Sequence, residues 1–132
     1  MNVLLWILQI LLGIYFTLIG VMHFIVPPGL PAQMAWMYDL PTWLHYVSGI
    51  AEILGGLGLI LPAVTRIRTN LVPLAALGLT LVMIGAVIYH VGRGEYQNIA
   101  LNLLLAAILA FVAYGRWKLK PLADRSVAGQ SA

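Results

Sequence analysis

The sequence places a few side chains that could exchange protons or form hydrogen bonds within long apolar runs. Glu52 lies in the stretch VSGIAEILGG (47–56) and is one of only four acidic residues among 132. The other polar residues in these runs or at their ends are His23, His45, Tyr89, His90, Asn98 and Asn102. A carboxyl group near imidazoles could form a protonatable site beside a quinone or another small amphiphile. It could equally be a polar clasp that holds helices together.

Metal and cofactor chemistry receive little support from the residue spacing. Imidazole and carboxylate ligands suit zinc or iron, but the chain contains no HxxxH or ExxH spacing. It has no cysteine, which excludes disulfides and thiolate ligands. The sequence GGLG (55–58) follows no predicted strand and is not a nucleotide-binding loop. We therefore expect no metal site, no intrinsic cofactor and no enzyme activity of the chain on its own.

The composition is that of an integral membrane protein. Hydrophobic residues make up 62% of the chain and charged residues 8%, whereas a soluble domain carries about a quarter charged residues. A helix needs roughly 20 apolar residues to cross a bilayer, and four continuous runs are near that length: 3–26, 45–64, 71–91 and 99–116. We predict an all-α, four-helix membrane bundle over residues 1–120, followed by a short disordered tail over 121–132.

The basic residues predict the orientation of this bundle. Six of the seven Lys and Arg residues lie in the 65–70 loop or after residue 115, and only Arg93 lies on the other side. The positive-inside rule then places both termini in the cytoplasm, for a multi-pass protein of the cell inner membrane. The net charge of +3 does not suggest a nucleic-acid partner, because the basic residues flank apolar runs.

The outer loop, 27–43, is rich in proline, methionine and aromatic residues. Its segment PAQMAWMYD (31–39) is predicted either as a short helix lying on the membrane or as a loop anchored by its aromatic side chains.

Helical spacing brings the polar residues together on inward-facing stripes. Each of the first three runs has such a stripe: Gln9, Gly13, Phe16, Gly20 and His23; then His45, Ser48, Glu52, Gly55, Leu59 and Pro62; then Pro73, Ala76, Thr80, Met83, Val87 and His90. Asn98 and Asn102 lie one turn apart at the start of the fourth run. At 1.5 Å per residue, Glu52 is about 10 Å deeper than His45. A charge inside the membrane costs a few kcal/mol, so we expect Glu52 to point inward and to be protonated or paired. We predict that these polar groups form one cluster in the outer half of the bundle.

Four segments carry a resemblance to a known family: GVMHF (20–24), SGIAEILGGLGLILP (48–62), PLAALGLTLVMIGAVIYHVGRGE (73–95) and NLLLAAILAFVAYGRW (102–117). The chain resembles the DoxX-like family over nearly all of residues 5–117. The specific features are Glu52 with the glycines that follow it, His90 before RGE, and Asn102. The resemblance implies a four-helix membrane bundle whose founding members resemble small subunits of quinone-linked, sulfur-oxidising membrane enzymes. Many relatives have a lysine where this chain has His23. A histidine at this position makes a pair with Glu52 titratable near neutral pH.

Two functional hypotheses follow. In the first, the chain is a quinone-associated redox accessory subunit that contacts quinone through Glu52, His23, His90 and Asn102, with His45, Tyr89 and Asn98 nearby. In the second, it is a non-catalytic structural subunit or assembly factor of a larger membrane complex. A small transporter is a third alternative. In each case we expect the lipid bilayer and other membrane proteins, or further copies of the chain, as partners.

Overall fold

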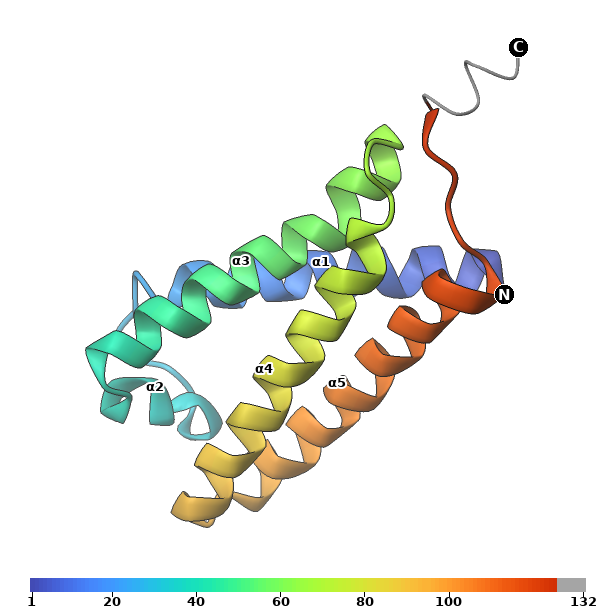
Figure 1. Cartoon of the computed structure of the whole chain (residues 1–132). Helices are drawn as coiled ribbons and strands as arrows, with labels where there is room; N and C mark the ends of the chain where they lie inside the picture. Colours follow the sequence, from blue (N-terminus) through green and yellow to red (C-terminus); the bar gives the residue numbers. More distant parts are fainter. Residues whose placement is uncertain (126–132) are drawn as a thin grey trace.

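A computed structural model describes residues 1–125, which fold into helices without strands (Figure 1). Four helices are long and apolar enough to cross a membrane, and they confirm the predicted four-helix membrane bundle. The elements in chain order are α1 (Asn2–Met22), η1 (Ala32–Met34), α2 (Trp36–Asp39), α3 (Thr42–Thr65), α4 (Leu71–Arg93), α5 (Tyr96–Tyr114) and the π-helical segment η2 (Gly115–Leu119).

The four long helices form two pairs that cross each other. α1 packs along α3, α4 packs along α5, and α3 joins the pairs through its contact with α4. The pairs diverge toward the left of Figure 1, where α2 lies between them. We call this the histidine end, because it holds His23, His45 and His90. The opposite end, with Arg66 and Arg116, is the arginine end.

The helix boundaries differ from the predicted runs mainly at the histidine end. α1 ends at Met22 instead of residue 26, so His23 lies in the turn that follows it. The two prolines at 27 and 28 disfavour helix in the residues before them. α3 begins at Thr42, directly after Pro41, so His45 lies within its first turn.

The predicted inward stripes are buried or half-buried, and most large apolar side chains on the other helix faces are exposed to what would be lipid. The half-buried members are His45, Ser48, Pro73, Thr80 and Val87. All five residues of the α1 stripe, from Gln9 to His23, are buried. In α3 the stripe includes the fully packed Leu59 and the Glu52 carboxyl, which is only 4% exposed. The apolar core between the pairs is built around Leu5, Phe16, Leu59, Leu79 and Leu109.

Glycines bring the backbones of α1 and α3 into contact. A Cβ atom added to Gly20 would lie 2.9 Å from the Gly49 carbonyl oxygen, and one added to Gly56 would lie 2.7 Å from the Gly13 carbonyl oxygen. These two antiparallel pairs have the same spacing of seven residues on each helix. Small residues permit this close approach in membrane helices. The approach also sets His23, at the end of α1, beside the first turns of α3.

The arginine end contains a buried polar group that the sequence analysis did not foresee. The sequence predicts Arg116 as a solvated charge of the cytoplasmic tail, but its side chain is buried and the residue is only 2% exposed. Its guanidinium donates Nε–H to Gln9 Oε1 and Nη1–H to Asn2 Oδ1, the latter at 2.6 Å. The ring of Trp6 lies 5.5 Å from its central carbon. These contacts tie the end of α5 to the start of α1.

Part of the predicted disordered tail is also held at this end. The Asp124 carboxylate accepts hydrogen bonds from the hydroxyl of Thr69, at 2.6 Å, and from its backbone N–H, at 2.8 Å. These hydrogen bonds lower the pKa of the Asp124 carboxyl. Residues 121–125 therefore pack against the loop between α3 and α4. The rest of the predicted tail, 126–132, lies outside the described residues.

The α1–α3 contact predicts a difference between two glycine-to-alanine substitutions. Gly56→Ala places a methyl group 2.4 Å from Thr17 Oγ1 and against the α1 backbone, so we expect a loss of about 1–3 kcal/mol from overpacking. Gly78→Ala is the matched control in α4, because an added Cβ meets nothing within 4 Å. Unfolding in mild detergent measures both. Equal stability of the two variants would contradict the backbone contact.

The orientation of the bundle stays a prediction from the positions of its charges, and the cysteine-free chain makes it directly testable. Gln33 and Asn70 are exposed at the histidine end and the arginine end, respectively. A membrane-impermeant maleimide added to spheroplasts should label Gln33→Cys at once and Asn70→Cys only after permeabilisation. The reverse pattern would show that the termini are outside.

Candidate functional site

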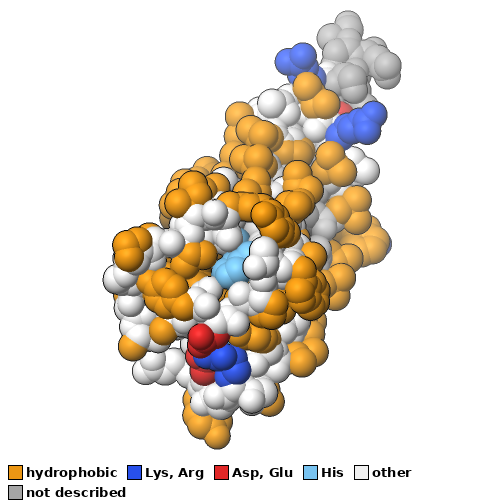
Figure 2. All heavy atoms as spheres, turned by 90° about the vertical axis from the view of Figure 1, so that its left-hand side faces the viewer, with side chains coloured by type: hydrophobic (Ala, Val, Ile, Leu, Met, Phe, Trp, Pro, Cys, Tyr) orange, Lys and Arg blue, Asp and Glu red, His pale blue; other side chains and the backbone are white. Residues whose placement is uncertain are grey.

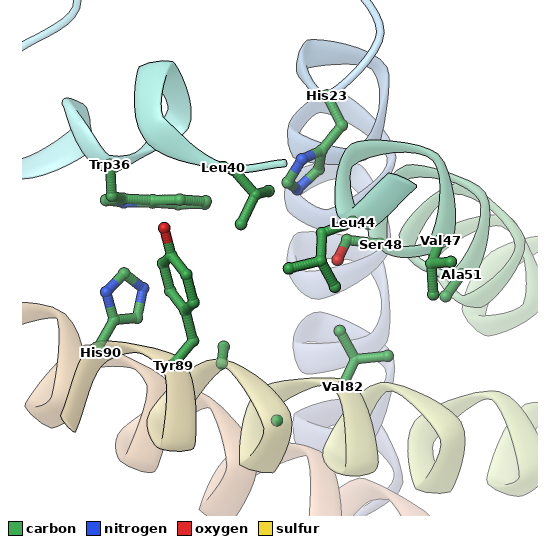
Figure 3. Close-up of a pocket in the computed structure, with 12 residues that line it drawn as sticks. His23, Trp36, Leu40, Leu44, Val47, Ser48, Ala51, Val82, Tyr89 and His90 are labelled. Atoms are coloured by element: carbon green, nitrogen blue, oxygen red, sulfur yellow. The ribbon is translucent and has the colours of Figure 1, made fainter. Parts of the chain in front are cut away.

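A cavity of about 250 Å³ lies at the histidine end, between α3 and α4 and beneath α2 (Figure 3). Its lining is mostly apolar. The lining residues are His23, Trp36, Leu40, Leu44, Val47, Ser48, Ala51, Val82, Gly85, Ala86, Tyr89 and His90. An apolar enclosure with a few polar groups is the usual form of a small-molecule site. The cavity is therefore the candidate site of this protein.

The roof of the cavity is the outer-loop segment 31–40, which we call the lid. It folds as η1 and α2 and places the Trp36 ring over the cavity, in edge contact with His90 at 5.1 Å between ring centroids. In Figure 3 the Tyr89 hydroxyl points toward the Trp36 ring. Of the two predictions for this segment, the helical one is correct in part, but α2 covers the cavity and buries Met37 to 1% exposure.

Glu52, His23 and His45 form a continuous series of polar contacts, and of the three only His23 lines the cavity. Glu52 Oε2 lies 3.3 Å from His23 Nε2. His23 Nδ1 lies 3.0 Å from His45 Nδ1, and His45 Nε2 lies 2.9 Å from the Met37 carbonyl oxygen in the lid. The contact between Glu52 and His23 has an ion-pair distance without the alignment of a full hydrogen bond. Oε2 has no hydrogen-bond partner among the described residues, so His23 is its polar neighbour.

A second imidazole–carboxylate pair lies on the opposite helix pair. The loop after α4 turns at Gly94, which has a φ of 70°, and returns the Glu95 carboxylate to within 2.9 Å of His90 Nδ1. Arg93 donates Nε–H to the same carboxylate oxygen and Nη2–H to Asp39 of the lid, each at 2.8 Å. Burial raises the pKa of the Glu95 carboxyl, but the hydrogen bonds and charges of His90 and Arg93 outweigh it and lower that pKa overall.

These contacts define how His90 is protonated. An ionised Glu95 only accepts hydrogen bonds, so His90 Nδ1 carries a proton and donates it to Glu95. The other ring nitrogen, Nε2, makes no hydrogen bond to any described residue. His90 can therefore accept a proton at Nε2 from a group in the cavity, and Glu95 stabilises the imidazolium that results.

The structure brings together some of the predicted cluster and leaves the rest apart. Three of the seven residues line the cavity: His23, Tyr89 and His90. Glu52 and His45 do not line it, but both contact His23. Asn98 and Asn102 are partly exposed on α5 and neither line the cavity nor hydrogen-bond to its residues. The predicted contribution of all four spans is therefore wrong for the fourth, because α5 packs on α4 and is separated from α3.

Sequence reasoning missed the roof and the outer pair of charges. The sequence predicts the aromatic side chains of 31–39 as membrane anchors, counts Arg93 only as an outer charge, and gives Glu95 no role beyond its place in RGE. The proximity of Glu95 to His90 did have a signal in the sequence, since a glycine between them permits the tight return of the chain. In Figure 2, which looks onto this end, histidine atoms are visible among apolar side chains, and the charged side chains of this end gather in one small group, apart from those at the far end of the molecule.

The polar side chains form a linear series and do not converge on a point. Within residues 1–125, no three His, Asp or Glu side chains are arranged to bind a metal ion. A linear series of imidazole and carboxyl groups is suited to proton transfer, because each group can act as a donor or as an acceptor.

Comparison with known proteins gives one match, at the level of the family. Neither a search of curated proteins nor one of solved structures returned a match. A family model, described as the DoxX-like family, matches residues 7–112 and so includes most of α1, all of α3 and α4, and every residue that lines the cavity. The chain is a multi-pass membrane protein, and it belongs to the DoxX-like family.

Proposed function

We propose that this protein binds the head group of a quinone, or of a closely similar aromatic amphiphile, in the cavity beneath Trp36. The observation that carries the proposal is an apolar cavity at the histidine end with an imidazole in each of two walls, His23 and His90, each next to a carboxylate outside the cavity lining. Quinones and quinols exchange protons as well as electrons at their ring oxygens. A site for them needs an apolar ring slot and groups that donate and accept protons beside it.

The size and opening of the cavity fit such a ligand. An apolar cavity of about 150 Å³ holds benzene, so a cavity of about 250 Å³ has room for a substituted ring. The lining residues Val47 and Gly85 are exposed on the sides of α3 and α4. The cavity therefore opens laterally between these helices, which would let an apolar tail extend into the bilayer.

Two side chains of α4 are placed to contact the ring oxygens. His90 has its Nε2 available, and Glu95 is positioned to stabilise a proton taken up there. Tyr89 presents a hydroxyl on the same side of the cavity, beneath the ring of Trp36 (Figure 3). Such groups bind a carbonyl by donation and a hydroxyl by acceptance. His23 contributes a wall but no free nitrogen, since Nε2 faces Glu52 and Nδ1 faces His45.

We further propose that the chain acts as an accessory subunit that holds or delivers the quinone to a redox partner in the membrane. The exposed apolar sides of the helices supply contact with lipid and room for such a partner. The alternative, a structural subunit or assembly factor, predicts stable association with a larger complex and an empty cavity.

The cavity can be tested by filling it. Ala86 lines the cavity, and Ala86→Phe should lower quinone affinity at least tenfold by occupying the ring slot. Ala107→Phe, on an exposed face of α5 that does not line the cavity, is the matched control and should bind as the wild type does. The measurement is saturable binding of a short-chain quinone analogue to protein in lipid nanodiscs, with mass spectrometry of co-purified quinone.

Empty nanodiscs give the background from partition of the analogue into lipid. If all three proteins only match that background, the quinone proposal is wrong. If the wild type also co-purifies with a larger complex, the structural alternative takes its place.

A further inference from the structure

The direction of the hydrogen bonds between Glu52 and the lid follows from one fixed point. The Met37 carbonyl oxygen can only accept, so His45 donates to it from Nε2 at 2.9 Å. In a neutral His45, Nδ1 then carries no proton and accepts from His23 Nδ1–H, 3.0 Å away. A neutral His23 in turn has its lone pair on Nε2, facing Glu52 Oε2 at 3.3 Å.

This order of donors and acceptors requires one proton between Glu52 and His23 Nε2. Two lone pairs would face each other if both Glu52 and His23 Nε2 lacked a proton. Either Glu52 is a carboxylic acid that faces a neutral His23, or Glu52 is a carboxylate that faces an imidazolium. In both cases the series Glu52–His23–His45 holds three protons and has no net charge. The proton nearest Glu52 is the one that can move.

Movement of that proton reverses the whole series. A proton passes from Glu52 to His23 Nε2, the Nδ1 proton of His23 passes to His45 Nδ1, and the Nε2 proton of His45 leaves to water. His45 is partly exposed at the histidine end, so water can reach it. One proton has then left, Glu52 is a carboxylate that accepts from His23 Nε2–H, and His45 Nδ1–H donates to His23 Nδ1.

Between these two states, only the contact of His45 with the lid loses its hydrogen bond. In both states a proton on one partner faces a lone pair on the other in the 3.0 Å contact of His23 with His45. The same holds for the 3.3 Å contact of Glu52 with His23, which must shorten and align before a proton passes. It does not hold for the contact of His45 with the Met37 carbonyl, because the lone pair of Nε2 faces the carbonyl oxygen once the proton has left. Met37 belongs to α2, the element that carries Trp36 over the cavity.

We infer that Glu52, His23 and His45 form a proton relay from the interior of the bundle to the histidine end, and that the protonation state of the relay controls the lid over the cavity. When the relay holds its three protons, which we call the loaded state, His45 donates to the Met37 carbonyl and holds the lid in place. When it is unloaded, that hydrogen bond is lost and the cavity, which already opens laterally between α3 and α4, also becomes accessible from the histidine end. The relay does not depend on the identity of the cavity ligand, so it stands or falls separately from quinone binding.

Other titratable groups around the relay come from every element that packs against it. α1 also contributes Tyr15, which is within electrostatic range of Glu52. α2 contributes Tyr38 and Asp39, which are bonded to Pro27 and Arg93, respectively. α4 contributes Tyr89, His90 and Arg93, and the following turn contributes Glu95. Among the described residues, none of these makes a hydrogen bond to a relay side chain.

Nitrogen-15 NMR of histidine-labelled protein in nanodiscs tests the relay at each ring nitrogen. At low pH we expect His45 to be protonated at Nε2. As pH rises and the relay loses its proton, we expect the His45 proton to be at Nδ1. Glu52→Gln removes the proton that the relay can lose, and the Met37 carbonyl oxygen then favours the loaded direction. His45 should therefore keep its Nε2 proton across the pH range in which the wild type changes tautomer. Asp124→Asn, at the arginine end, is the matched control and should titrate like the wild type.

Hydrogen–deuterium exchange of residues 31–40 measures the coupling to the lid. After correction for the intrinsic effect of pH, wild-type exchange should accelerate several-fold across the same pH range in which His45 changes tautomer. In Glu52→Gln, exchange should stay slow throughout. A His45 ring with one tautomer at all pH values, or a Glu52→Gln variant whose histidines and lid still titrate as in the wild type, would overturn the inference.

Discussion

A charged side chain inside the hydrocarbon region of a bilayer costs a few kcal/mol, and Glu52 is only 4% exposed within α3. This carboxyl group must share a proton with a neighbour or carry one itself. His23 is the group that reaches it, at 3.3 Å, and His23 is in turn held by His45. The arrangement of the histidine end follows from this requirement.

Two structural features satisfy the requirement. The glycine contacts bring the α1 and α3 backbones together, so that a residue at the end of α1 reaches one three turns into the α3 sequence. The lid then supplies the Met37 carbonyl that fixes the direction of the hydrogen bonds. Because the lid also carries Trp36, the same contacts that stabilise a buried carboxyl define the roof of the cavity. Arg93 and Asp39 provide a second tie between the lid and α4.

Much of this fold could be predicted from the sequence, because lipid imposes simple rules. Continuous apolar runs define the four spans, and a 3–4 residue spacing of small and polar residues defines the inward face of the first three. The position of the lid could not be predicted, since Trp36 and Met37 suit a membrane interface as well as a cavity roof. The burial of Arg116 was also hidden, because a basic residue after an apolar run normally marks a solvated flank. Asn98 and Asn102 lie apart from the cavity because α5 packs mainly on α4, and the spacing of residues along one run does not define which helices are neighbours.

The central claim is that Glu52 and His23 act as a pair around one proton, and a double-mutant cycle tests it most directly. Glu52→Leu or His23→Leu alone leaves one buried polar group without its partner, whereas the double variant removes both. Unfolding of the four proteins in mild detergent should give a coupling energy of about 1–3 kcal/mol, with the double variant more stable than the sum of the single effects predicts. Additive effects, with no coupling beyond about 0.3–0.5 kcal/mol, would contradict the account.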